Sequence, residues 1–151
     1  MASNIELTGL AKDLAARSQS GKPVRIGLIG SGEMGTDIVT RAAMMDGVDV
    51  AAISELNVPN AHKAVSISHQ EEGHSQDAKS TDELDSIIES GKTAITDNAD
   101  WILESGLIDV VIDATGIPSV GAEIGLRAME RGKHLTMMNV EADVTIGAYL
   151  R

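Results

Sequence analysis

Residues 24–35 of the chain are VRIGLIGSGEMG, a short apolar run followed by three closely spaced glycines. The run over residues 24–29 is almost continuously apolar, which is typical of a strand buried on both faces of a parallel sheet. Gly30, Gly32 and Gly35 then follow in the spacing G-x-G-x-x-G, and a helical pattern begins at Met34. A strand, this turn and a helix in that order favour a site for the pyrophosphate of a dinucleotide.

Each glycine of the turn has a predicted role. Gly30 permits the tight turn, Gly32 lets the backbone approach the pyrophosphate, and Gly35 lets the helix pack closely on the strand. The phosphates would lie on the unpaired N–H groups and positive dipole end of the helix. The alternative is a structural strand-to-helix turn without a dinucleotide. The predicted phosphate site comprises Gly30, Ser31, Gly32, Glu33, Met34 and Gly35.

Strand and helix patterns alternate along the whole chain. Further strands are expected over residues 48–53, 93–96, 107–114 and 134–138. Helices are expected over about 4–18, 34–45, 59–65, 81–90, 98–103 and 118–131. A polar loop is expected over 69–79, and the next helix only beyond Arg151. This alternation predicts an α/β fold, namely a Rossmann-type doubly wound parallel sheet in three α/β/α layers.

Composition narrows the class of protein. The 151 residues, 42% of them apolar, suit one globular domain over residues 1–151. The absence of cysteine excludes disulfides and thiolate metal sites. A net charge of −11 and only two aromatic residues argue against a nucleic-acid partner. No apolar run is long enough to span a membrane, and residues 1–20 do not form a signal peptide, so we expect a cytoplasmic protein.

The end of the second strand offers a candidate for the adenosine side of the site. An acidic residue about 20 positions beyond the glycine turn typically binds the ribose hydroxyls, and Glu55 is the natural candidate. A carboxylate there would repel a 2′-phosphate and favour NAD. The alternative is a solvated loop charge. Arg41 and Lys63 are nearby cations that would support NADP instead, so both cofactors stay open.

The ends of the last two strands predict the nicotinamide side, because ligands of doubly wound sheets bind beyond the carboxyl ends of the strands. The residues expected there are Ala114, Thr115, Gly116 and Asn139. Asp113 and Glu141 lie beside them as candidate acids or bases, with helix capping as the favoured alternative. The sequence assigns no catalytic residue.

The four histidines do not predict a metal site. His69 and His74 flank a polar stretch that lacks the H-E-x-x-H order, so a solvated loop is expected. His62 and His134 are isolated in the sequence, with no serine or cysteine nucleophile in a recognisable setting.

Three segments together resemble a known family. They are residues 24–35, VRIGLIGSGEMG; residues 109–116, DVVIDATG; and residues 132–145, GKHLTMMNVEADVT. This combination resembles the homoserine-dehydrogenase-like NAD(P)-binding domain that precedes a SAF domain in certain bacterial oxidoreductases. Some members of that group are deoxyxylulose-phosphate reductoisomerase-like enzymes that use NADPH. The likeness runs over nearly the whole chain, and it implies an oxidoreductase with NAD or NADP as its cofactor.

Two positions depart from that family. In homoserine dehydrogenases a lysine follows the asparagine after the last strand, whereas Val140 follows Asn139 here. In the reductoisomerase-like members arginines follow the second strand, whereas this chain has Glu55. The resemblance also implies that the substrate and catalytic residues lie mostly downstream of Arg151, in a separate domain.

The combined expectation is a cofactor-binding domain for hydride transfer to or from a small carbonyl or hydroxyl compound. Its expected partners are the dinucleotide, a small-molecule substrate and, in the longer protein, further copies of itself. The alternative is a regulatory module that senses NAD(H) without catalysis. A methyltransferase that uses S-adenosylmethionine is a weaker alternative, because the glycine spacing is that of a dinucleotide site.

Overall fold

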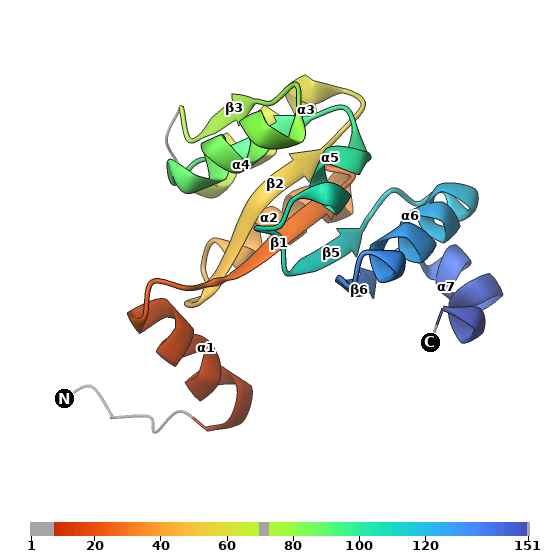
Figure 1. Cartoon of the computed structure of the whole chain (residues 1–151), viewed down its shortest axis with the longest axis horizontal. Coiled ribbons are helices and arrows are strands. Elements are labelled where there is room, and N and C mark those ends of the chain that lie inside the picture. The colour runs from red at the N-terminus through yellow and green to blue at the C-terminus, as the bar shows by residue number, and fades with distance from the viewer. Residues whose placement is uncertain (1–7, 70–72, 151) are drawn as a thin grey trace.

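The computed structural model describes residues 8–69 and 73–150. Its centre is a six-stranded, all-parallel sheet in the order β3-β4-β2-β1-β5-β6 (Figure 1). The strands are β1 (Val24–Ile29), β2 (Val48–Ser54), β3 (Ser75–Asp77), β4 (Thr93–Thr96), β5 (Val110–Asp113) and β6 (His134–Met137).

Helices cover both faces of this sheet and complete the predicted three layers. The helices are α1 (Gly9–Gln19), α2 (Glu33–Ala42), α3 (Val58–His69), α4 (Thr81–Glu89), α5 (Ala99–Glu104), α6 (Pro118–Glu130) and α7 (Val140–Ile146), followed by the 3-10 helix η1 (Gly147–Tyr149). Apolar residues of α2 and α3 pack in one core cluster, and those of α4, α5 and α6 pack in the other. The predicted doubly wound α/β fold is therefore confirmed.

The core consists of aliphatic side chains from the central strands, with helices packed on both sides. Leu28 of β1, Ile53 of β2 and Ile95 of β4 are completely buried. Burial on both faces explains why these strands are apolar without alternation. Burying such aliphatic side chains contributes roughly 1.5–3 kcal/mol each.

The strand order reverses beside β1, and this reversal positions the candidate site. From β1 the chain moves to β2, then to β3 at the outer edge and back to β4 between β3 and β2. It then returns past β1 to form β5 and β6 on the other side. The connections that follow β1 and β5 therefore lead to helices on opposite faces of the sheet, at the carboxyl ends of the strands, where doubly wound sheets form the crevice that binds their ligands. The two segments that the sequence predicts for cofactor binding, residues 30–35 and 114–116, lie at these carboxyl ends.

Two differences separate the structure from the sequence-based expectation. The expected loop over 69–79 contains β3, a polar strand at the edge of the sheet, where exposed residues carry no apolar pattern. Residues 70–72 of that loop lie outside the described residues. The prediction that the next helix begins only beyond Arg151 is wrong, because Asn139 starts α7 within the chain.

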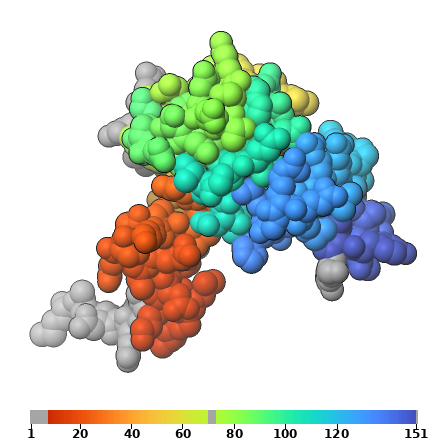
Figure 2. Space-filling model, viewed as in Figure 1, coloured from red at the N-terminus to blue at the C-terminus, as the bar shows by residue number. Residues whose placement is uncertain are grey.

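Helix α1 stands apart from the layered body. It begins at Gly9 in the structure, while residues 4–7 of the expected helix lie outside the described residues. None of its residues is buried, and it projects from the sheet as a separate arm (Figures 1 and 2). Its closest approach is at Gly47, where a side chain would collide with the carbonyl of Leu14. Among residues 8–69 and 73–150, no helix has the length and apolarity to cross a bilayer.

Candidate functional site

The glycine turn links β1 to α2 at the crevice. Gly30 has a φ of +93°, in the left-handed region that L-residues with side chains rarely adopt. Its N–H donates to the carbonyl of Ser54 at 2.8 Å, which ties the turn to the end of β2. A Cβ at this position would lie 2.8 Å from the carbonyl oxygen of Ala114, so the turn also lies directly against the loop after β5.

The other two glycines of the turn differ in the space around them. A Cβ on Gly35 would collide with the carbonyl oxygen of Gly30, so this glycine lets α2 start close to its own strand. A Cβ on Gly32 would meet nothing within 4 Å. Gly32 is the N-cap of α2 and offers no side chain to the first N–H groups of the helix. The turn thus leaves open space beside unpaired N–H donors, which is the arrangement that binds a phosphate.

The carboxylate of Glu55 reaches from the end of β2 into this turn. Its Oε2 accepts hydrogen bonds from the backbone N–H of Ser31 at 2.7 Å and from the Ser31 hydroxyl at 3.0 Å. Its Oε1 accepts from the N–H of Asn57 at 3.0 Å. Burial raises the pKa of Glu55, but the hydrogen bonds from Ser31, Asn57 and the N–H of Leu56 outweigh burial and hold the pKa below its usual range. Glu55 is therefore a charged acceptor at the glycine turn and not simply a solvated loop residue.

The two cations that were considered for an NADP phosphate lie elsewhere. Arg41 lies in the last turn of α2, eight residues beyond Glu33, which places it about 12 Å along the helix from the glycine turn. Lys63 lies in α3 and lines a cavity with His62 and His74. Among the ion pairs of the described residues, none joins Arg41 or Lys63 to the Glu55 carboxylate.

A buried hydrogen-bond network supports the loop at the ends of β5 and β6. Asp113 and Asn139 are both completely buried. Oδ1 of Asp113 accepts from the N–H and the hydroxyl of Thr115 at 3.0 and 2.8 Å. The amide of Asn139 donates to the carbonyl of Ile117 at 2.9 Å and to the Thr115 hydroxyl at 3.4 Å, and its Oδ1 accepts from the N–H of Ala142 at 3.3 Å. The network therefore joins two chain segments, residues 113–117 and 139–142.

This network decides how the predicted nicotinamide-side residues lie. Ala114 and Thr115 are partly exposed and Gly116 is exposed, so their backbone borders the crevice. Asn139 lies underneath them and caps α7, and direct contact between its side chain and a cofactor stays a prediction. Oδ2 of Asp113 is buried without a hydrogen-bond partner, beside Gly121, where any side chain would collide with it. Glu141 is exposed in the first turn of α7.

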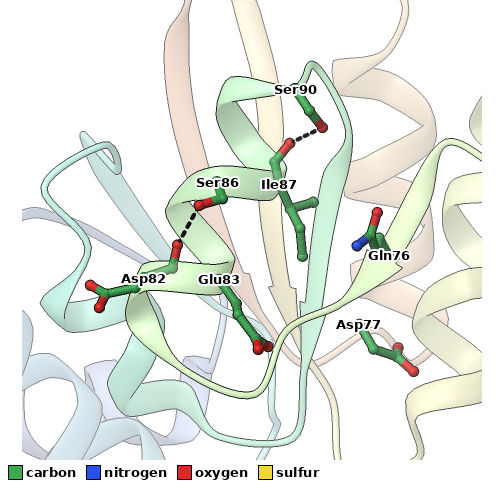
Figure 3. A pocket seen from close by; sticks show the side chains of 7 residues that line it. All are labelled: Gln76, Asp77, Asp82, Glu83, Ser86, Ile87 and Ser90. Carbon is green, nitrogen blue, oxygen red and sulfur yellow. Dashed lines mark hydrogen bonds between the residues drawn. The ribbon is translucent and has the colours of Figure 1, made fainter.

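A cavity of the outer part of the sheet lies away from the glycine turn. One of about 500 Å³ separates β3 from α4 (Figure 3). Asp82 and Glu83 bring carboxylates to its wall, whereas the carboxylate of Asp77, another lining residue, points away from α4 and lies 2.7 Å from Nε2 of His62 in α3. Hydroxyls of α4 that face it bond within the helix, to the carbonyls of residues 82 and 87. An acidic wall would repel a dinucleotide, so this cavity is not the candidate cofactor site.

One cluster of chemistry-bearing side chains was not predicted from the sequence. His62 of α3, which is isolated in the sequence, lies between Ser75 and Asp77 of β3 at 2.7 Å from each. The sequence feature that could have revealed this cluster is the spacing of Ser75 and Asp77, because residues two apart lie on one face of a strand. That segment was expected to be a loop. His69 and His74 stack at 4.6 Å. Within the described ranges, no group of three or more His, Asp or Glu side chains is arranged to hold a metal ion.

Comparison with known proteins adds information about the fold. The sequence matches no family model and no curated protein. The structure is similar to myo-inositol dehydrogenase from Lactobacillus casei in complex with NAD(H) and myo-inositol, with a TM-score of 0.56, 19% identity, and coverage of 76% of this chain and 28% of that one. It is also similar to a myo-inositol dehydrogenase from Corynebacterium glutamicum, with a TM-score of 0.54, 16% identity, and coverage of 83% and 33%.

A third similar structure is a mutant 3-ketoreductase from Actinomadura kijaniata in complex with TDP-benzene and NADP, with a TM-score of 0.51, 20% identity, and coverage of 76% and 29%. The chain therefore spans about a third or less of the length of these proteins. All three are oxidoreductases, and two are in complex with a nicotinamide dinucleotide. The likeness establishes that the chain has the α/β Rossmann-like fold of their nucleotide-binding part.

Proposed function

We propose that the chain binds a nicotinamide dinucleotide at the glycine turn and supplies the cofactor-binding part of an oxidoreductase. The observation that carries this proposal is the joint geometry of Gly32 and Glu55. Gly32 leaves open space at the first N–H groups of α2, and the Glu55 carboxylate reaches the same turn from β2. A phosphate binder and a hydroxyl acceptor side by side match the pyrophosphate and the adenosine ribose.

The pyrophosphate is held by backbone groups. The N–H groups at the start of α2 point at it, and the helix dipole adds a favourable field although the chain is acidic overall. Glu55 accepts hydrogen bonds from the ribose diol, either beside its bond to Ser31 or in exchange for it. The same negative charge repels a 2′-phosphate, so we propose NAD(H) as the preferred cofactor and NADP(H) as the weaker ligand.

The loop after β5 forms the nicotinamide side. Thr115 and Gly116 border the crevice, and the buried pair Asp113 and Asn139 holds this loop in place. The bound nicotinamide supplies hydride transfer, and the loop contributes its orientation. A rigid loop serves this purpose because a small displacement of the reacting carbon slows the reaction strongly.

The substrate we propose is a small carbonyl or hydroxyl compound, since the similar structures include inositol dehydrogenases and a ketoreductase. A homoserine-dehydrogenase-like or reductoisomerase-like reaction is the finer proposal that the sequence resemblance supports. Val140 stands where the resemblance implies a lysine, and its side chain is 64% exposed. A homoserine-type reaction in this protein would therefore draw its proton transfer from another residue.

Calorimetric titration with NADH and NADPH tests the cofactor site. We expect saturable binding with tighter affinity for NADH, and a loss of at least tenfold in the variant Gly32→Val, whose side chain fills the phosphate position. Gly106→Val is the matched control, because a Cβ on Gly106 would also meet nothing within 4 Å. Gly106 lies before β5, at the amino ends of the strands and away from the glycine turn. Equal binding by both variants, or no binding of either dinucleotide by the wild-type chain, would contradict the proposal.

A second measurement concerns turnover. We expect the chain as given to bind NADH without oxidising it when small aldehydes or ketones are added. Steady oxidation of NADH by this chain would show that it carries its own catalytic groups, and it would overturn the expectation that these lie in another part of a longer protein.

A further inference from the structure

A histidine of α3 lies between a hydroxyl and a carboxylate at the edge of the sheet. Nδ1 of His62 is 2.7 Å from Oγ of Ser75, and Nε2 is 2.7 Å from Oδ1 of Asp77. Ser75 and Asp77 are two residues apart on β3, so their side chains leave the same face of the strand. A single imidazole therefore contacts both of them at once.

The two partners define the roles of the ring nitrogens. A carboxylate only accepts hydrogen bonds, so Nε2–H donates to Asp77. The lone pair of Nδ1 is then directed at the hydroxyl of Ser75, which donates to it. A serine that donates to a neutral imidazole, whose other nitrogen is held by a carboxylate, is the arrangement that activates a hydroxyl for nucleophilic attack.

Ser75 and His62 line a cavity. The cavity has a volume of about 300 Å³ and is lined by His62, Lys63, Val65, Ser66, Gly73, His74 and Ser75. Asp77 does not line this cavity but lies on the other side of the imidazole. Ser75 and His62 thus line the cavity in which a ligand would bind, whereas Asp77 contacts His62 from outside this cavity.

The backbone of β3 adds a donor near the serine. The carbonyl of His74 accepts from the N–H of Thr93, and the N–H of Ala78 donates to the carbonyl of Ile95. Even-numbered residues of β3 therefore pair with β4, and the N–H of Ser75 points outward at the open edge of the sheet. With the ammonium of Lys63 in the cavity wall, this N–H is available to stabilise negative charge on a substrate oxygen.

We propose that Ser75 and His62 are catalytic residues of a site that hydrolyses small esters with short acyl groups, with Asp77 as the positioning residue. Oγ of Ser75 attacks the ester carbonyl carbon while its proton moves to Nδ1 of His62. The bond to the alkoxy group then breaks, and the leaving oxygen takes that proton from His62 and departs as the alcohol. Water repeats both steps on the acyl-serine and releases the carboxylic acid, so ester and water give acid and alcohol without a redox cofactor.

The site is distinct from the dinucleotide site, because β3 is the outermost strand of the described sheet and the glycine turn follows β1 at its centre. The proposal therefore stands or fails independently of cofactor binding. The substrate class follows from the cavity. Its volume of about 300 Å³ accommodates a short acyl chain, and Lys63 places a cation at its wall.

Labelling of the intact protein with a fluorophosphonate tests the nucleophile directly. We expect one phosphonate per chain, located on Ser75 by peptide mass spectrometry. The variant Ser75→Ala is expected to lose the label, and Ser86→Ala, which removes a hydroxyl of α4 outside this cavity, is expected to keep it. Absence of label on Ser75 of the wild-type protein would overturn the proposal, whatever the folding of the variants.

Hydrolysis of p-nitrophenyl acetate tests the reaction. We expect kcat/KM to fall at least tenfold in Ser75→Ala relative to Ser86→Ala, with circular dichroism confirming that both variants fold. Asp77→Asn is expected to lower kcat at least tenfold while KM stays within twofold, because an amide that donates to Nε2 leaves Nδ1 protonated and unable to accept. Equal hydrolysis by Ser75→Ala and Ser86→Ala would show that the contacts of His62 with Ser75 and Asp77 only connect β3 to α3.

Discussion

The carboxylate of Glu55 accepts a hydrogen bond of 2.7 Å from the backbone N–H of Ser31, across 24 residues of sequence. The bond joins the residue that follows β2 to the middle of the turn that follows β1. It exists because β1 and β2 are parallel neighbours, so their carboxyl ends meet at one edge of the sheet. One side chain thus holds the glycine turn in shape and brings a negative charge to it.

The first prediction concerns cofactor preference. Glu55→Ala should weaken NADH binding by about tenfold or more, the equivalent of about 1.5–3 kcal/mol for a hydrogen bond to a charged group. NADPH binding should become stronger, since the charge that repels its 2′-phosphate is gone. Calorimetric titration measures both affinities. Glu89→Ala on α4 is the control, and unchanged preference in Glu55→Ala would contradict the assignment of Glu55.

The second prediction concerns stability at low pH. The pKa of Glu55 in the folded protein is below its usual value, so the unfolded chain takes up this proton first as pH falls. The stabilisation from ionised Glu55 is complete above the pKa of an ordinary glutamate and is lost as pH falls through the lowered value. Urea unfolding should therefore show wild type more stable than Glu55→Gln at pH 7, with the difference shrinking toward pH 3. A difference that is constant or grows on acidification would be inconsistent with the lowered pKa.

The third prediction separates two glycines of one motif. Gly35→Ala should lower the free energy of unfolding by about 1–3 kcal/mol, because its Cβ meets the carbonyl of Gly30. Gly32→Ala should leave stability within about 1 kcal/mol of wild type, since its Cβ enters open space, and should weaken dinucleotide binding instead. Urea unfolding and titration of both variants check this. The interpretation fails if Gly32→Ala is the more destabilised of the two.

The fourth prediction concerns the buried network beneath the loop after β5. Asn139→Ala removes the cap of α7 and the side-chain donor to the carbonyl of Ile117, which keeps only the N–H of Gly121, for an expected loss of about 2–3 kcal/mol. Asn98→Ala is the matched control, because the Asn98 side chain caps α5 through one bond to the N–H of Asp100. Its expected loss is about 1 kcal/mol. Equal losses in urea unfolding would mean that the bond to Ile117 adds nothing.

The accuracy of the sequence-based prediction follows the burial of each segment. The strand over residues 24–29 was predicted with its observed bounds, because a strand buried on both faces is apolar throughout. Strand β3 was missed, since it consists of Ser75, Gln76 and Asp77 at the edge of the sheet, where no apolar pattern is required. Helix α7 was missed because it follows β6 after only two residues and exposes Val140 and Val144, so its pattern does not resemble that of a buried helix.

The sequence by itself determined the strand, the three glycines and the helix that follows, and therefore where a phosphate would bind. Those features are local, because backbone conformation and the N–H groups of one helix end depend on neighbouring residues. Only the tertiary structure decided which polar side chains meet: Glu55 with Ser31, Asn139 with Ile117, and His62 with Ser75 and Asp77. Hydrogen bonds act over about 3 Å, and these partners lie 13 to 24 residues apart in the chain, so the packing of strands and helices alone brings them within that range.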